Sequence, residues 1–81
     1  MGNIDQTLEY EVPFQGAAQR SALFRDMDTY MPRLERIGAI GSYSMVNGSS
    51  EHVTVRVDIL DPTMKRIIDS KVMAYAGARE I

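Results

Sequence analysis

The chain has 81 residues, of which 44% are hydrophobic and 25% are charged, a composition typical of a folded domain and not of a disordered or fibrous chain. This length allows one domain, residues 1–81, with a single sheet layer and its covering helices. The formal net charge of −2 and the pI of about 5.2 disfavour nucleic acid as a partner, and the absence of cysteine excludes disulfides and thiolate chemistry.

The chain contains no apolar run that approaches the ~20 residues needed to span a bilayer. Its first residues, MGNIDQ, lack the basic and apolar regions of a signal peptide. We therefore expect no membrane association. The missing cysteines favour a reducing, cytoplasmic location.

The first predicted element is a strand in the stretch TLEYEVPF, residues 7–14, where apolar and polar side chains alternate. Its apolar side consists of Leu8, Tyr10, Val12 and Phe14. Because Pro13 has no N–H, the strand should lie at a sheet edge or end near this residue.

A helix is predicted next, between Gly16 and Gly38. Its apolar stripe consists of Leu23, Met27, Tyr30, Leu34 and Ile37, widened by Phe24 and Met31. Pro32 lies inside this pattern, where it costs an unbroken helix about 3 kcal/mol, so we expect a kink or a break near residues 28–31. Since the stripe keeps its phase through the proline, a kink with continued packing is favoured over a loop.

The segment AIGSYSMVNGSSEHVTVRVDI, residues 39–59, predicts a hairpin with its turn at Asn47 and Gly48. One face should hold Ala39, Gly41, Tyr43 and Met45 together with Val53, Val55, Val57 and Ile59. Because opposed residues share a face, the loop must have an odd length of about three or five residues, with a bulge at the tip. The expected pairs are Tyr43 with Val53, Gly41 with Val55 and Ala39 with Val57.

The last predicted helix begins at Asp61, a good N-cap, followed by Pro62 at the first helical position. Its apolar positions are Met64, Ile67, Ile68, Val72 and Tyr75. Gly77 is the expected stop, and residues 78–81 allow a brief terminal strand.

The order strand, helix, strand, strand, helix predicts an α+β fold, the ferredoxin-like sandwich. We expect a three-stranded antiparallel or mixed sheet with two helices on one face and a short C-terminal fourth strand as an option. The first strand should lie beside the third. Its apolar side should rest on Leu23, Met27, Leu34, Ile67 and Ile68.

The sequence contains few residues that could act in catalysis. His52 is the only histidine, and its strand position points it to the polar face, so we expect it to be exposed and uninvolved. Asp26 and Asp28 point about 200° apart on a helix and cannot act as a pair on one atom. We expect no catalytic residue, cofactor or metal, and we favour a protein that is not an enzyme.

The run VPFQGAAQRSALFRDMDTYMP, residues 12–32, resembles the opening of polyketide-cyclase and lipid-binding START-type domains. The resemblance covers about a quarter of the chain and implies a domain that binds a small ligand. The long sheet and deep cavity of such domains need more residues than this chain has left.

Without a clear fourth strand, the first strand is a free edge that invites pairing with another chain. We therefore expect an interaction module that self-associates, as a homo-oligomer, or docks on a larger protein through this edge and the adjoining helix surface. The expected partner-binding residues are Leu8, Tyr10, Val12, Met31, Lys65 and Arg66.

Two other functions stay open. The first is a ligand-binding or enzymatic domain with a pocket between sheet and helices, where Tyr10, Tyr30 and Tyr43 supply polar groups. The second and least favoured is nucleic-acid binding through the helix that carries Lys65 and Arg66. The expected open sheet face, where RNA-recognition folds of this topology stack bases, has no Phe, Tyr or Trp.

Overall fold

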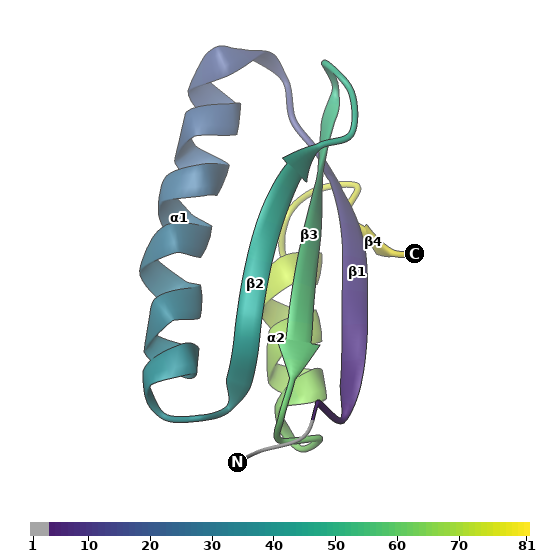
Figure 1. Ribbon diagram of the computed structural model, residues 1–81. Coiled ribbons are helices and arrows are strands. Elements are labelled where there is room, and N and C mark those ends of the chain that lie inside the picture. Colours follow the sequence, from purple (N-terminus) through teal and green to yellow (C-terminus); the bar gives the residue numbers. More distant parts are fainter. Residues whose placement is uncertain (1–3) are drawn as a thin grey trace.

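A computed structural model describes residues 4–81 as a four-stranded sheet with two helices (Figure 1). In chain order the elements are β1 (Gln6–Pro13), α1 (Gly16–Arg36), β2 (Ile40–Asn47), β3 (His52–Ile59), α2 (Met64–Met73) and β4 (Arg79–Glu80). All strand pairs are antiparallel, in the order β2-β3-β1-β4. The expected ferredoxin-like α+β fold is confirmed, β1 lies beside β3, and the optional fourth strand is present.

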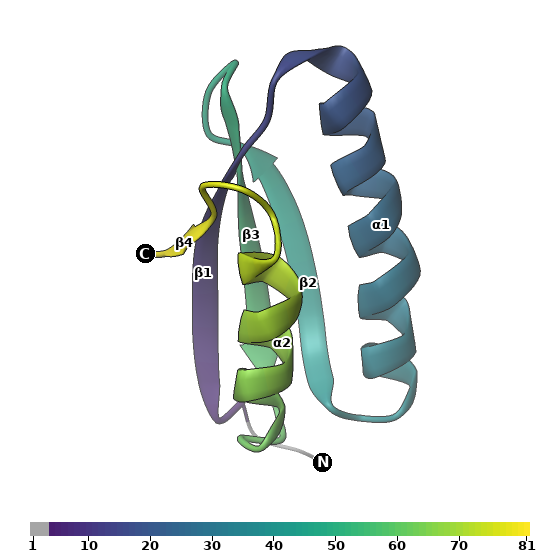
Figure 2. The same cartoon turned by 180° about the vertical axis from the view of Figure 1, so that it is seen from behind.

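One face of the sheet is buried under both helices. Along β1 and β3 the side chains alternate, so that opposed residues such as Tyr10 and Val55 both enter the core. From behind, α2 lies in front of β1 and β3 while α1 runs along β2 (Figure 2). The helices contribute Leu23, Met27, Met31, Leu34, Ile68 and Val72 to this core.

Helix α1 continues through Pro32 without a break. The proline has no N–H to offer the C=O of Asp28, but Met27 and Met31 before it and Leu34 after it are all buried. Burial of this continuous stripe therefore outweighs the local cost of the proline. Ile37, the expected end of the stripe, is instead 73% exposed because the helix ends one residue earlier.

Strand β2 contains a bulge at its start that the alternation did not predict. Ile40 lies opposite Ile59, but Ser42 lies opposite Asp58, so Gly41 is the extra residue. The bulge places Ile40 in the core, although strict alternation with Ala39 and Gly41 predicts that Ile40 lies on the polar face. The bulge expected at the hairpin tip was therefore misplaced.

The hairpin loop has the odd length that parity required. Asn47 and Val53 are opposed, which leaves five residues, 48–52, between them. The predicted register is wrong, since Tyr43 lies opposite Val57 and not opposite Val53, and the pairs of Gly41 with Val55 and Ala39 with Val57 do not form. Because the shift of four residues is even, residues 42–47 of β2 and the residues of β3 still lie on the expected faces, and only the residues at the bulge differ.

Helix α2 begins later in the chain than its pattern indicated, and fewer of its apolar residues are buried. Asp61 caps the preceding turn, where its Oδ1 accepts hydrogen bonds from the N–H and Oγ1 of Thr63 at 3.0 and 2.7 Å. Ile68 is fully buried, but Ile67 is 51% exposed, so its expected core position is wrong. Gly77, with a φ of +78°, lies in the turn that returns the chain to β1 as β4.

Candidate functional site

The edges of the sheet differ from the expected arrangement. β1 was expected to be a free edge, but β3 lies on one side of it and β4 lies on the other. β4 covers β1 only opposite Tyr10 and Glu11. The strand with a fully open edge is β2, which has eight residues and no strand beyond it among residues 4–81.

The backbone groups of β1 alternate between these two neighbours. The N–H of Phe14 donates to the C=O of Glu51 at 2.9 Å, so the antiparallel ladder directs the even-numbered residues of β1 toward β3. The odd-numbered residues point outward, and the C=O of Glu9 accepts a hydrogen bond from the N–H of Ile81 at 2.9 Å. Thr7, beyond the end of β4, directs its backbone groups to the same outer side.

The predicted partner-binding residues fall into two groups. The side chains of Leu8, Tyr10, Val12 and Met31 are buried in the core. Lys65 and Arg66 lie on α2, where Lys65 is half-buried and Arg66 is exposed. A partner that pairs with β1 therefore meets its outer backbone and its neighbouring charges, not the four apolar or aromatic side chains.

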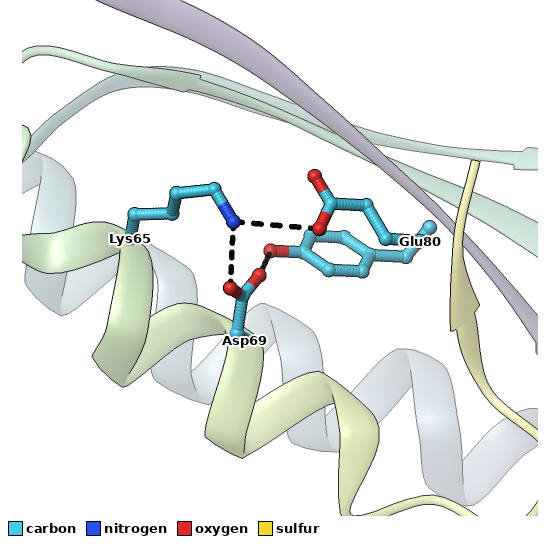
Figure 3. Close-up of polar contacts among 4 residues, drawn as sticks. Lys65, Asp69 and Glu80 are labelled. Carbon is cyan, nitrogen blue, oxygen red and sulfur yellow. Dashed lines mark hydrogen bonds and ion pairs between the residues drawn. The ribbon is translucent and has the colours of Figure 1, made fainter.

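Lys65 joins α2 to the C-terminal strand (Figure 3). Its Nζ lies 2.8 Å from Oδ2 of Asp69 and 3.4 Å from Oε1 of Glu80. The hydroxyl of Tyr10 donates to Oδ1 of Asp69. We call these four residues the Lys65 cluster, and they connect β1, α2 and β4.

The protonation states within the Lys65 cluster are those of a structural network. Burial raises the pKa of Tyr10, and the carboxylate of Asp69 raises it further. Burial also acts to raise the pKa of Asp69, but hydrogen bonds from Lys65 and Tyr10 outweigh it and hold this pKa below its usual value. At neutral pH Tyr10 therefore keeps its proton and Asp69 stays ionised.

The edge strand β2, with the sequence IGSYSMVN, carries no charged side chain. The N–H of Gly48 donates to the C=O of His52 at 3.2 Å, so the ladder directs even-numbered residues toward β3. Tyr43 and Met45 consequently direct their backbone N–H and C=O groups outward. On the open face, Val46 is 58% exposed.

Helix α1 holds β2 from one side. The hydroxyl of Tyr43 donates to Oδ1 of Asp28 at 2.9 Å, and the guanidinium of Arg20 donates to Oδ1 of Asn47 at 2.9 Å. These contacts use side chains. The outward backbone edge of β2 stays free of them.

The open face of the sheet is polar and centred on Asp58. Its two carboxylate oxygens accept hydrogen bonds of 2.8 Å, one from the hydroxyl of Thr7 on β1 and the other from the hydroxyl of Ser42 on β2. These hydrogen bonds lower the pKa of Asp58. One carboxylate thus ties three strands together.

Asp58 is expected to make folding stability sensitive to acid. Because its pKa is lower in the folded than in the unfolded state, its contribution is present above about pH 4 and is lost as the pH falls through the folded-state pKa. The loss of unfolding free energy between about pH 6 and pH 2 should therefore be smaller in Asp58→Asn than in the parent chain, as measured by urea titration at each pH. Glu51→Gln, which removes an exposed carboxylate at the hairpin tip, is the control. Equal losses in Asp58→Asn and the parent would contradict this assignment.

His52 is half-buried and makes contacts, contrary to expectation. Its Nδ1 lies 2.9 Å from Oγ of Ser49, and its Nε2 lies 3.6 Å from Oε2 of Glu11. This order of serine, histidine and acid is not a hydrogen-bonded relay, because 3.6 Å is too long for a hydrogen bond. The Oγ of Ser49 also accepts the N–H of Glu51 at 3.0 Å, which indicates a role in shaping the turn.

A surface pocket of about 360 Å³ opens between α1 and the segment that follows α2. It is lined by Pro13, Phe14, Gln19, Ala22, Leu23, Asp26 and Tyr75. The hydroxyl of Tyr75 donates to Asp26 and lowers the pKa of that carboxyl, and Lys71 lies 3.3 Å from it. The hydroxyl of Tyr75 and the carboxylate of Asp26 are thus already paired within the chain. Tyr10, Tyr30 and Tyr43, which were expected to supply polar groups to a pocket, do not line this one.

Two further observations concern metal sites and membrane-spanning helices. Among residues 4–81 there is no group of three or more His, Asp or Glu side chains that could hold a metal ion. In the same part of the chain, no helix is both long enough and apolar enough to cross a membrane.

Comparisons with protein families, with curated proteins and with solved structures find no match to this chain. The resemblance of residues 12–32 to START-type domains stays an expectation from the sequence. In the structure, buried side chains such as Tyr10 and Met27 fill the space between the four-stranded sheet and the helices.

Proposed function

We propose that this chain is a small, non-enzymatic protein-interaction module that acts through a free edge strand and the adjoining helix surface, and that the strand is β2. The observation that carries the proposal is the uncharged, eight-residue edge of β2, which has no covering strand. Natural proteins commonly protect such edges with charges, prolines or a cover. β1 has all three kinds of protection: the charges of Glu9 and Glu11, the proline Pro13, and the covering strand β4. β2 has only the bulge at Gly41.

The proposed partner is a second copy of the chain, paired β2 to β2 in antiparallel orientation. Such a pair is related by a twofold axis and is self-complementary. Because β2 has no charged residue, the pairing places no like charges opposite each other. The outward groups of Tyr43 and Met45 would gain partners, and the two sheets would form one continuous sheet.

Ligand binding has less support than this pairing. The space between sheet and helices, where a pocket was expected, is occupied by buried side chains, and the pocket beside Tyr75 lies at the surface. Nucleic-acid binding has less support still, because the open face, among the described residues 4–81, carries Glu9, Glu11 and Asp58 and no Phe, Tyr or Trp side chain. A cytoplasmic setting remains our expectation from the absence of cysteine.

The test is to place a charge on the exposed part of the β2 edge. Val46→Lys puts a cation into both halves of the proposed pair at a position that is 58% exposed, so the monomer fold should be unaffected. Light scattering over a concentration series should give a dimer for the parent chain and a monomer for this variant. Circular dichroism should give the same spectrum for both.

Ile67→Lys is the matched control, because Ile67 is 51% exposed and lies on α2. This variant should dimerise like the parent. A parent chain that stays monomeric at every concentration, or a Val46→Lys variant that dimerises normally, would reject β2 pairing between copies.

A further inference from the structure

We infer a second docking site at the edge of the sheet opposite to β2. There, an extended segment of a partner protein takes the place of β4 along the outer edge of β1. The partner segment runs antiparallel to β1 and carries a basic, an acidic and a basic residue in succession. The proposal shares with the proposed function the idea of pairing at a strand edge, but it does not require the β2 dimer.

The first observation is that β4 occupies little of the edge available to it. It has two residues, both exposed, against the eight residues of β1. Its end is held by the hydrogen bond from the N–H of Ile81 to Glu9. Strands usually have about five or six residues, so β4 makes a short and easily displaced pairing.

The second observation is that exposed ion pairs hold the side chains of β4. Arg79 lies 3.3 Å from Glu11, with its own side chain 70% exposed. Glu80 lies 3.4 Å from Lys65, and these side chains are 40% and 37% exposed. Ion pairs at such exposure contribute little, so a competing segment has little to overcome.

The same contacts define the chemistry of the competitor. Opposite Glu11, on the open face, the edge accepts a basic side chain, as Arg79 demonstrates. One position further along, on the helix side, Lys65 accepts an acidic side chain, as Glu80 demonstrates. At the next position, the apolar residue Ile81 lies opposite Glu9 and forms no ion pair with it. A basic residue at this position of the partner segment would pair with the carboxylate of Glu9.

A longer partner strand would also gain backbone hydrogen bonds that β4 does not make. Continuing in the register of β4 past Glu9, it would reach the outward N–H and C=O groups of Thr7. It would thus add both a charge pair and ladder hydrogen bonds. For this reason we expect a segment of matching charge order to displace β4, although β4 belongs to the same chain.

The experiment uses the complete chain and a short synthetic peptide in which Arg, Glu and Lys occupy the positions facing Glu11, Tyr10 and Glu9, followed by alternating threonine and valine. Amide NMR spectra should change at residues 7–11 and 79–81 when the peptide is added. A control peptide with the three charges reversed should bind about tenfold more weakly, since it sets like charges against Glu11 and Glu9.

A locked variant isolates the displacement step. Glu9→Cys/Ile81→Cys joins two residues that already share a hydrogen bond, at a spacing of about 5.5 Å between Cα atoms that suits a disulfide, in a chain with no other cysteine. The reduced form should bind the first peptide, although more weakly than the parent chain because Glu9 no longer pairs with its lysine, and the oxidised form should not bind it. Equal binding by both forms, or no change at residues 7–11 of the parent chain, would overturn the inference.

The two proposals can fail separately. Val46→Lys lies on β2 and should bind the peptide like the parent chain, whatever its oligomeric state. Spectral changes confined to residues 40–47 would mean that the peptide pairs with β2, which rejects the β1 site. Peptide binding at β1 together with a monomeric parent chain would reject only the dimer.

Discussion

Replacing Ile68 by alanine is expected to lower the free energy of unfolding by about 2–5 kcal/mol. The side chain is fully buried in the core between the sheet and α2, so its truncation removes apolar contacts and leaves a cavity. Small domains have a total stability of about 5–15 kcal/mol, which makes this loss a large share of the whole. Urea titration at neutral pH measures it directly.

The neighbouring residue provides a control with the same chemistry. Ile67 is on the same helix but is 51% exposed, so Ile67→Ala should cost no more than about 0.5 kcal/mol. Similar losses for the two variants would restore the assignment made from periodicity, which placed both residues in the core. A larger loss for Ile67→Ala would mean that α2 packs on the sheet through a different side.

Asp69→Ala is expected to cost about 1–3 kcal/mol of unfolding free energy, because it leaves the hydroxyl of Tyr10 buried without its acceptor. The loss of the ion pair with Lys65 adds little, since that contact is partly exposed. The effect should therefore depend on the hydroxyl of Tyr10 more than on the charge of Lys65.

A double-mutant cycle tests this dependence. Tyr10→Phe removes the hydroxyl and keeps the ring in the core, so Asp69→Ala introduced into that background should cost clearly less than in the parent chain. The Lys65→Met background should leave the cost of Asp69→Ala nearly unchanged. If the cost is the same in the parent and in Tyr10→Phe, the contact between Tyr10 and Asp69 does not contribute to stability.

Periodicity predicted the strands well, because alternation reports which side of a strand is buried. Leu8, Tyr10 and Val12 were assigned to the core on this basis, and all are buried. The same residues were also expected to bind a partner. A side chain that is buried under α1 and α2 cannot also contact a partner. In addition, the backbone N–H and C=O groups of β1 that point outward are those of the odd-numbered residues.

The polar pairs of tyrosine and aspartate could not be predicted in the same way. Tyr10 pairs with Asp69, Tyr43 with Asp28 and Tyr75 with Asp26, at sequence separations of 59, 15 and 49 residues. No local pattern marks such partners, since each pair forms only after a helix has docked on the sheet or a loop has folded back. A tyrosine in an apolar stripe is the single available signal, because its hydroxyl needs a partner when it is buried.

The sequence by itself determined the order of the elements, the buried sides of β1 and β3 and the odd loop of the hairpin, because each follows from backbone geometry within a few residues. The tertiary structure alone decided the hairpin register, the exposure of Ile67, the inward turn of Ile40 at the bulge and the identity of the open edge. These features depend on which surfaces meet when distant elements pack together. The open edge is the clearest case, since β4 covers part of β1 only after α2 has brought residues 79–80 beside it.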